Sequence, residues 1–408
     1  MFNLNFYPPA RGANRSKYGL RVFLLMLMLA GLFGAVPSNA QIYCGTETHT
    51  PQPFIKGGTG INRNPPVQGV ITIPVVVHIV YNTMQPAGNI TDAQVISQIN
   101  VLNEDFRRLN ADAVNTPSVF SGVAADVEIE FCLASEDPNG LPTNGITRTH
   151  TPLTPTSYQI SSNDMKSSAT YGKDGWPPQS YLNVWVVGLQ TGAYGKSSTP
   201  DQLSTNPELD GIVVEYQAFG TTGAVLPPFD KGRVLTHEVG HWLDLRHTWG
   251  GIDLNTTGCN IDDMLQDTPT QNGPTIGNAS NCIYPGLNSC TDAGTDYADM
   301  FQNYMDYTDD ECKNLFTQDQ KAVMRALFEP GGIRASILNS TGCCTPTTCA
   351  CASAQDLIFN TSGNVIAGTQ IINGTIFVEA GGELTVTGTL RFTSNSGIVV
   401  RRGGRLHV

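Results

Sequence analysis

The pattern of apolar and polar positions predicts a sheet with helices packed on it. Residues 71–80 are almost wholly apolar and β-branched, which is typical of a strand buried on both faces. Between Thr91 and Leu109 the apolar residues recur at intervals of three and four, so we expect a helix with one buried face. Further strands are expected at residues 127–133, 181–189 and 211–216, and further helices at 232–243 and 317–327. This mixture predicts an α+β fold.

Two later segments depart from this pattern. Residues 250–312 are rich in Asp, Asn, Gly, Pro and Cys without any period, which predicts irregular chain held by disulfides. Residues 376–386 align with residues 398–408 at an offset of 22, and six of the eleven positions are identical. Strands around a Gly-Gly turn, repeated at that period, predict a parallel β-solenoid, although the chain stops within a strand. The tail is therefore expected to be either a truncated solenoid or a short β-sheet appendage.

The N-terminal segment has the features of a secretory signal. Residues 22–36 form one apolar run, the preceding residues include four basic side chains and no acid, and small residues follow at 37–40. The run is short for a membrane span, which favours a cleaved signal peptide over an uncleaved anchor. Export to an oxidising compartment predicts that most of the ten cysteines form disulfides.

Composition and charge narrow the range of functions. Charged residues make up only 14% of the chain, and 40% of it is hydrophobic, which is enough for a packed core. The net charge is −12, and the acid-free leader means that the remainder is more acidic still. Because nucleic-acid binding needs clustered cations, we expect no nucleic-acid partner. The hydrophobic content argues against intrinsic disorder. We also expect no membrane association after the signal peptide is removed.

The strongest chemical signal is His237-Glu238-Val239-Gly240-His241, which lies on the helix expected at 232–243. Histidines four positions apart on a helix project from one face, as two ligands of one metal ion require. Glu238 stands beside them and can deprotonate a water on that metal. His247 reaches the same ion if the chain leaves the helix near Asp244 and turns back. Three imidazoles leave one zinc position open, which is the arrangement of a catalytic site.

A second motif, Asn303-Tyr304-Met305-Asp306-Tyr307, lies downstream. Together with HExxHxxxxxH it resembles the metzincin metallopeptidases, whose methionine turn runs beneath the zinc site. The closer resemblance is to the pappalysin-like (cytophagalysin) family, over residues from about 70 to 342. It is carried by IPVVVHIVY, LNEDFRRLN, IEFCLA, DGIVVEY, THEVGHWLDLRHTWG, DDMLQDTP and NYMDYTDDEC. The resemblance implies a zincin fold with a twisted mixed sheet, a backing helix, an active-site helix and an irregular lower subdomain.

The same resemblance implies the roles of the residues in the zinc motif. His237, His241 and His247 would be the zinc ligands, and Glu238 would be the general base and later the acid. The metzincins have Gly where this chain has Asp244. That position needs a left-handed backbone, which Asp tolerates better than most residues, so we expect a small cost in stability and a working site.

The methionine turn carries two further implied roles. Met305 would form the apolar floor of the turn, which an ordinary core methionine would also do. Tyr307 would help to hold the tetrahedral oxyanion, a role that a phenolic donor can fill. Without the motif, Tyr307 would be an ordinary core or surface tyrosine.

Cys44-Gly45 follows the signal peptide and offers a device for latency. A thiolate there could occupy the open zinc position, as cysteine switches do in this clan. The alternative is a disulfide between Cys44 and Cys132, because secreted thiols usually pair.

The irregular segment carries implied disulfides and a candidate calcium site. The family's cysteine arrangement implies the pairs Cys259–Cys290 and Cys282–Cys312. Between them, residues 262–268 offer carboxylate and carbonyl oxygens, which calcium favours. Because the family binds calcium in this segment, the resemblance implies Asp263 and Thr268 as the candidate ligands. The alternative is an acidic surface loop.

The resemblance implies that the segment after the methionine turn shapes the pocket for the residue just past the scissile bond. Here it contains Asp309, Asp310 and Glu311. An acid at the pocket base, with Glu311 as the candidate, would favour Arg or Lys, although three adjacent acids are also typical of a solvated loop. Residues 192–195 could supply an edge strand that pairs with an extended peptide.

The sequence therefore predicts a secreted zinc endopeptidase, made as a latent precursor, that hydrolyses protein or peptide substrates with metal-activated water. The alternative is a secreted adhesion protein with a non-catalytic metal site and a binding tail, and the intact Glu238 argues against it. A non-peptidase zinc hydrolase is disfavoured by His247 and the methionine turn. The oligomeric state is not predicted. The expected organisation is a signal peptide at 1–40, a pro-segment at 41–65, a catalytic domain at 66–342, a Cys-rich linker at 343–352 and a β-solenoid-like segment at 353–408.

Overall fold

The computed structural model describes most of the chain between residues 67 and 343 and parts of both ends. The described residues are 44–46, 67–153, 158–190, 193–251, 256–292, 294–343, 357–359, 364–372, 376–378, 381, 383–392, 398–400 and 405–407. The predicted signal peptide, most of the predicted pro-segment and most of the predicted Cys-rich linker therefore lie outside the described residues. Among the described residues, no helix combines the length and the apolar character that a membrane crossing requires.

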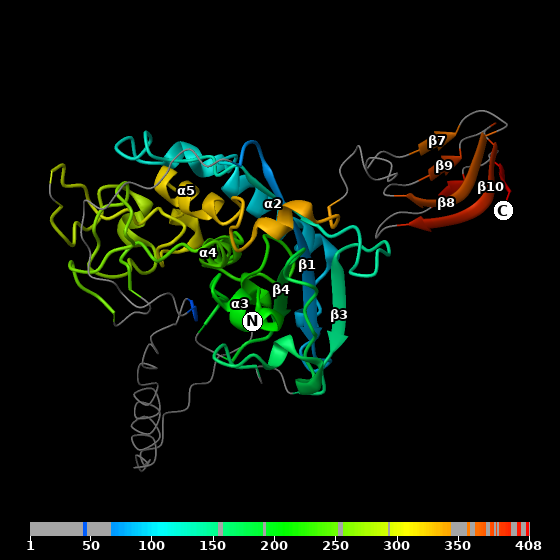
Figure 1. The fold of residues 1–408 in the computed structure, drawn as a ribbon, viewed down its shortest axis with the longest axis horizontal. Coiled ribbons are helices and arrows are strands. Elements are labelled where there is room, and N and C mark those ends of the chain that lie inside the picture. The colour runs from blue at the N-terminus through cyan, green and yellow to red at the C-terminus, as the bar shows by residue number, and fades with distance from the viewer. Residues whose placement is uncertain are drawn as a thin grey trace, which may run out of the picture. The chain divides into compact units, whose positions relative to one another are not determined.

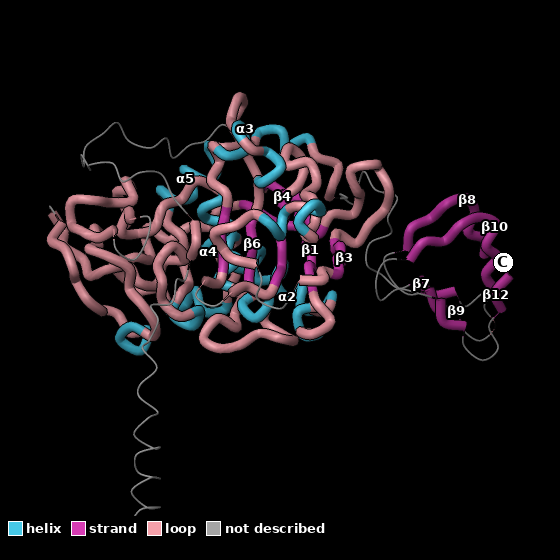
Figure 2. The backbone as a smooth tube through the Cα atoms, turned by 90° about the horizontal axis from the view of Figure 1, so that it is seen from below, coloured by secondary structure: helices cyan, strands magenta, loops and turns pink. Residues whose placement is uncertain are grey.

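A six-stranded mixed sheet forms the centre of the first part of the chain (Figures 1 and 2). Its order is β2-β1-β4-β6-β5, with β3 also paired to β1, and only β5 runs antiparallel to its neighbour. The strands are β1 (Ile71–Tyr81), β2 (Ile129–Leu133), β3 (Ile146–His150), β4 (Leu182–Val187), β5 (Gly195–Ser197) and β6 (Ile212–Glu215). The four expected strands are confirmed, and β3 and β5 are added.

Strand β1 is buried on both faces, as its apolar sequence predicted. Its odd-numbered residues, such as Val75 and Val77, pack in the main core with residues of the helices. Its even-numbered residues Val76 and Val80 belong to smaller apolar clusters, because successive side chains point to opposite faces of a sheet. The sheet is therefore covered on both faces. The main core contains residues of both the sheet and the helices, so it holds the helices against the sheet.

Three longer helices pack with the sheet and the irregular segment. They are α2 (Asp92–Phe106), α4 (Arg233–Trp242) and α5 (Gln318–Ala326), and a single turn, α3, spans Gln202–Thr205. Helix α2 begins at the expected cap, where Thr91 Oγ1 accepts a hydrogen bond from the Gln94 N–H at 3.2 Å. Short 3₁₀ helices occupy the connections, at Pro86–Gly88, Ala111–Asn115, Asp164–Lys166, Ser168–Thr170, Pro207–Leu209, Tyr216–Ala218, Ala279–Cys282, Asp310–Cys312 and Ala335–Asn339.

The segment between α4 and α5 is irregular, as expected. Its described residues contain no α-helix or named strand, and two disulfides cross-link them, Cys259–Cys290 and Cys282–Cys312. These are the pairs that the family resemblance implied. A third disulfide joins Cys132 to Cys343, so Cys44 does not pair with Cys132.

The described residues of the tail form two three-stranded parallel sheets. One has the order β12-β10-β8 and the other β11-β9-β7. The two copies of the sequence repeat pair in register, with Ile376 opposite Ile398 and Leu384 opposite Leu406. The strands are β7 (Leu357–Phe359), β8 (Asn364–Ile372), β9 (Ile376–Val378), β10 (Glu383–Phe392), β11 (Ile398–Val400) and β12 (Arg405–His407).

Candidate active site

Helix α4 carries the first two histidines, and its end directs the chain toward the third. After Trp242 the helix closes with a hydrogen bond from the Leu245 N–H to the Gly240 carbonyl, at 2.9 Å. This reversal requires a left-handed residue, and Asp244 takes that conformation with φ +73°. The turn expected at Asp244 is present, and it brings His247 back to the helix.

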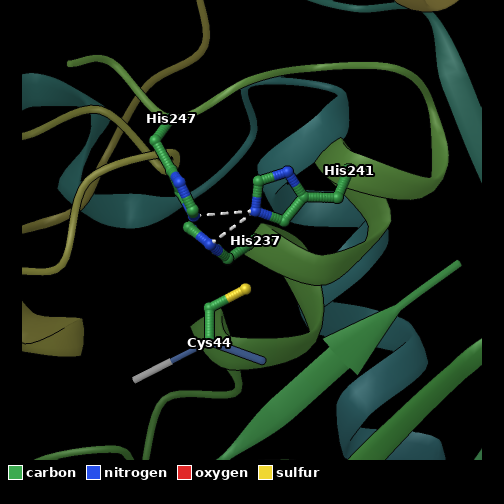
Figure 3. Close-up of side chains that lie close together, drawn as sticks. All are labelled: Cys44, His237, His241 and His247. Atoms are coloured by element: carbon green, nitrogen blue, oxygen red, sulfur yellow. Dashed lines mark hydrogen bonds between the residues drawn. The ribbon is translucent and has the colours of Figure 1, made fainter. Parts of the chain in front are cut away.

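The three imidazoles converge on one point (Figure 3). His241 Nε2 lies 3.0 Å from His237 Nε2 and 3.0 Å from His247 Nε2. Each Nδ1 lies 2.7–2.8 Å from a backbone carbonyl, those of Tyr304, Leu245 and Gly251. Since a carbonyl oxygen only accepts hydrogen bonds, each ring carries its proton on Nδ1 and directs an Nε2 lone pair into the centre.

This donor set fits a metal ion. Burial lowers the pKa of all three rings, so they are neutral, and three lone pairs at such close range repel one another unless a cation lies between them. Cys44 Sγ completes a group whose candidate ligand atoms all lie within 4.8 Å of one another. Figure 3 shows the sulfur directed toward the three rings. Burial and the neighbouring Glu238 raise the pKa of the Cys44 thiol, an effect that a bound cation would oppose.

The residues around Cys44 lie along strand β5 and reach the carboxylate of Glu238. The Gly45 N–H donates to the Gly195 carbonyl at 2.8 Å. Thr46 Oγ1 accepts from the Ser197 N–H at 2.7 Å and donates to Glu238 Oε2 at 2.7 Å. A Cβ at Gly195 would lie 2.7 Å from Glu238 Oε1, so the glycine allows the strand to approach the carboxylate. Thr46 was not singled out in the sequence, because nothing in its local pattern indicates a contact 192 residues away.

The methionine turn packs directly beneath the histidines. A Cβ at Gly240 would lie 2.4 Å from Met305 Sδ, so the helix can rest on the turn only because residue 240 has no side chain. Met305 is completely buried. Tyr307 is buried beside His237 and His247, with ring centroids 5.7 and 5.0 Å away. Burial and the neighbouring Cys44 and Glu238 raise the pKa of the Tyr307 phenol, so it remains a proton donor.

A buried network, which the sequence did not indicate, connects helices α2 and α4 with the methionine turn. Asp105 Oδ1 accepts from Tyr304 Oη at 2.7 Å and pairs with Arg233 Nη2 at 3.2 Å. Asp105 Oδ2 accepts from Thr236 Oγ1 at 2.8 Å. Thr236 precedes His237 and Tyr304 supplies the carbonyl for that histidine, so the network fixes both sides of one candidate ligand.

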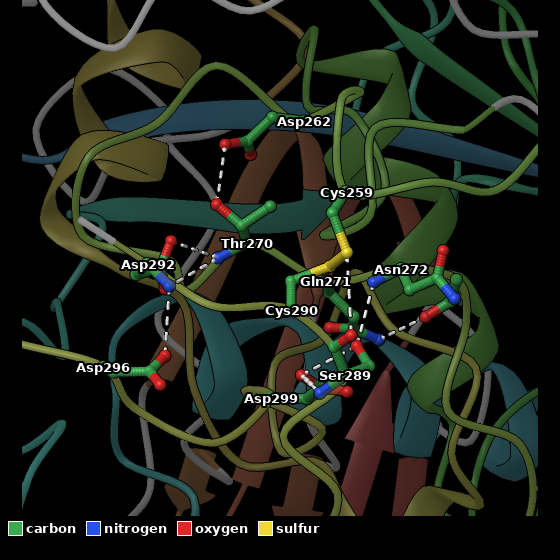
Figure 4. The surroundings of a disulfide bond; sticks show 11 residues. Cys259, Asp262, Thr270, Gln271, Asn272, Ser289, Cys290, Asp292, Asp296 and Asp299 are labelled. Carbon is green, nitrogen blue, oxygen red and sulfur yellow. Dashed lines mark hydrogen bonds between the residues drawn. A yellow bond between two sulfur atoms is a disulfide. The ribbon is translucent and has the colours of Figure 1, made fainter.

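The two candidate calcium ligands lie together in the irregular segment. Thr268 Oγ1 donates to Asp263 at 2.9 Å, and both residues are buried beside the buried Asp262. Burial and the adjacent carboxylate of Asp262 raise the pKa of Asp263, so two acids are held close together away from water. Figure 4 shows the disulfide Cys259–Cys290 in this region, where Thr270 donates to Asp262.

A pocket opens beside the candidate general base, and Glu311 does not line it. Glu311 is exposed and its carboxylate accepts a hydrogen bond from Asn278 Nδ2. Among the described residues, Glu238 and Lys313 are the only charged side chains that line this pocket. The lining residues are Cys44, Phe229, Val234, His237, Glu238, Tyr307 and Lys313.

Comparison with known proteins identifies the family. The Peptidase M43 model, described as pregnancy-associated plasma protein-A, matches residues 165–329. An extracellular metalloprotease of Pyricularia oryzae is 31% identical over 274 residues, which is 64% of this chain and 76% of that protein. Extracellular metalloprotease 1 of Coccidioides posadasii is 28% identical over 75% of this chain and 95% of its own length. The chain belongs to this family of metallopeptidases.

Solved structures agree with that assignment. Mature mirolysin of Tannerella forsythia, in complex with a cleaved peptide, is 46% identical over 67% of this chain and 97% of that chain, with a TM-score of 0.61. A point mutant of promirolysin from the same organism matches 67% of this chain and 85% of its own, at the same identity and TM-score. The chain is therefore a secreted metalloendopeptidase, and the peptidase prediction is confirmed over the adhesion alternative.

Proposed function

We propose that His237, His241 and His247 hold a catalytic zinc ion and that Glu238 moves the proton during peptide hydrolysis. The observation that carries this proposal is the convergence of three unprotonated Nε2 atoms beside a buried carboxylate. Zinc, when bound, supplies a Lewis acid that polarises the peptide carbonyl and makes water acidic. Glu238 accepts the proton of the attacking water and passes it to the leaving amine.

Tyr307 is the proposed donor to the oxyanion that develops on the substrate carbonyl. Its ring lies between 5.0 and 5.7 Å from two of the proposed ligand rings, and its raised pKa keeps the hydroxyl protonated at neutral pH. Tyr307→Phe should therefore lower kcat by roughly ten- to a thousandfold while leaving zinc binding unchanged.

The residues around Cys44 support a latent precursor in which two separate contacts block the active site. Cys44 would occupy the position that the attacking water needs, and Thr46 ties up Glu238 by its hydrogen bond. The hydrogen bond from Gly45 to Gly195 lies on the edge strand β5, where an extended substrate would pair. Peptide substrates agree with the cleaved peptide bound to mature mirolysin.

The contacts made by Cys44 and by Thr46 can be tested separately in the precursor. Cys44→Ala should give an uncut chain with measurable peptidase activity, and Thr46→Val should add activity mainly in that background. A Cys44→Ala chain that stays inactive until its leader is cut would contradict the switch. Ser204→Ala, which changes an exposed hydroxyl on α3, serves as the matched control.

A structural calcium ion is proposed at Asp263 and Thr268. The support is the burial of two adjacent carboxylates, Asp262 and Asp263, whose mutual repulsion a divalent cation would relieve. Calcium should raise the melting temperature of the wild-type chain and not that of Asp263→Ala. An equal rise in both proteins would refute the site.

The proposed domain boundaries remain those of the sequence, with a catalytic domain at 66–342. The tail is proposed to be a β-solenoid, supported by its two parallel sheets and by the in-register pairing of the repeat. Deleting residues 353–408 should leave the cleavage of short peptides unchanged.

The central test compares the activated wild-type enzyme with Glu238→Ala and His247→Ala. Wild type should cleave a mixed peptide library with about one zinc per chain, Glu238→Ala should retain zinc without cleavage, and His247→Ala should lose both. Thermal unfolding checks that the variants fold. Cleavage by Glu238→Ala at the wild-type rate would refute the assignment.

A further inference from the structure

Lys313 is a buried cation beside the candidate active site. It is 4% exposed, and the charges of Asp310, Asp306 and Glu238 act on its ammonium group. The side chain lines the pocket that also borders Glu238 and His237. A buried ammonium is costly, and a lysine that lines a ligand pocket can be stabilised further by a ligand group of opposite charge.

The position of this pocket indicates which substrate residue it receives. Glu238 delivers a proton to the leaving amine, so the side chain attached to that amine lies next to Glu238. The pocket beside Glu238 therefore receives the residue immediately after the scissile bond. Cys44 also lines the pocket, so release of the pro-segment opens it.

Apart from Glu238, the nearby acids Asp310 and Glu311 do not line this pocket. Asp310 is completely buried, and its Oδ2 accepts from the backbone N–H groups of Lys231 and Arg233 at 3.0 and 3.2 Å. Glu311 is exposed and bonded to Asn278. Neither is among the lining residues, whereas Lys313 is. Burial lowers the pKa of Lys313, whereas the charges of Asp310, Asp306 and Glu238 favour its ammonium form.

We propose that Lys313 is a specificity-determining residue that selects an acidic side chain immediately after the scissile bond and rejects Arg and Lys there. The proposal rests on the proposed function, because it uses Glu238 as the proton donor to the leaving amine. Phe229 and Val234 supply apolar walls, so a carboxylate meets Lys313 in surroundings that strengthen a charge pair. A substrate guanidinium or ammonium would meet a like charge in the same surroundings.

The test uses activated full-length enzyme and quenched peptides that differ only in the residue after the cut, namely Glu, Gln, Ala or Arg. Wild type should have a kcat/KM for the Glu peptide at least about tenfold above that for the Arg peptide. Lys313→Met, which keeps an unbranched side chain, should lose that ratio. Lys313→Arg should retain the preference. Lys231→Met removes an exposed charge nearby and is the matched control, with the wild-type ratio expected.

Each result has a distinct meaning. A wild-type preference for Arg, or an unchanged Glu-to-Arg ratio in Lys313→Met, would overturn the proposal even though the enzyme cleaves peptides. Failure of wild type to cleave any peptide at full zinc content would overturn the proposed function as well. Lys313→Met could lose cleavage because it is less stable, which a lowered melting temperature would reveal. In that case Lys313→Arg decides, because it must keep the Glu preference for the proposal to stand.

Discussion

Replacing Asp105 by Ala tests whether the buried network holds the active-site helix on the methionine turn. The carboxylate of Asp105 is inaccessible to solvent and accepts hydrogen bonds from Tyr304 and Thr236 in addition to its pairing with Arg233. The substitution leaves a largely buried guanidinium with one carboxylate fewer and leaves two buried hydroxyl groups without that acceptor. Helices α2 and α4 and the methionine turn are distant in sequence, so the local secondary-structure propensity of each does not replace the lost contacts between them.

The expected cost follows from the burial of the pair. Breaking a buried, hydrogen-bonded ion pair by removing one partner costs about 3–5 kcal/mol. The second carboxylate on Arg233, Asp112 at 2.8 Å, keeps the cost within that range because it retains part of the charge compensation. At about 2–4 °C per kcal/mol for a domain of this size, the melting temperature should fall by roughly 6–20 °C.

Thermal and urea unfolding of the full chain in the Glu238→Ala background, which prevents self-cleavage, measures this cost. Asp126→Ala is the control, because Asp126 pairs with Arg107 at a site where its side chain is 41% exposed, and such pairs contribute at most about 1 kcal/mol. Zinc affinity should also fall in Asp105→Ala, since both Thr236 and Tyr304 flank His237. Equal melting temperatures for the two variants would refute the reasoning.

Three further predictions address the methionine turn, pH and the disulfides. Gly240→Ala places a methyl group 2.4 Å from Met305 Sδ, so zinc retention and kcat should both fall, and Gly240→Ala/Met305→Ala should recover part of the zinc content. Burial raises the pKa of Glu215 to about 7, so the folded state binds the proton more tightly, and stability should decline by up to about 3 kcal/mol as pH rises from 4.5 to 7. Glu215→Gln should flatten that decline, and urea unfolding at each pH would detect an unchanged slope. Replacing Cys132 and Cys343 by Ser should lower the unfolding free energy by about 2–5 kcal/mol, and a wild-type urea midpoint would contradict this.

The main elements could be predicted because their patterns are unambiguous. The apolar run of β1 requires burial on both faces, and the spacing in α2 requires one buried face, so the strand and the helix follow from hydrophobicity alone. Strand β3, Ile-Thr-Arg-Thr-His, escaped prediction because its side chains are intermediate or exposed and it is held by backbone pairing with β1. Backbone pairing leaves no hydrophobic signal in a sequence.

The zinc motif was readable for a different reason. Its geometry is local, since a helix fixes the spacing of His237 and His241 and a single left-handed residue returns His247. Contacts between residues that are distant in sequence give no local pattern from which they could be predicted. The partners of Glu238 and of Arg233 come from residues 192 and 128 positions away, so only the assembled structure reveals Thr46 and Asp105.

The charge of the pocket beside Glu238 also could not be predicted from the sequence, although the residues concerned are close together in the chain. Three acids precede Lys313 and suggested an acidic pocket, yet the chain forms a 3₁₀ turn over Asp310–Cys312, and the Lys313 N–H approaches the Asp310 carbonyl at 3.4 Å. With three residues per turn, residues 310 and 313 fall on one side and residue 311 falls on another. Asp310 Oδ2 accepts hydrogen bonds from the backbone at the start of α4, Glu311 is exposed, and Lys313 lines the pocket together with Glu238. The substrate preference proposed for this chain therefore rests on the phase of one short turn, which net charge does not reveal.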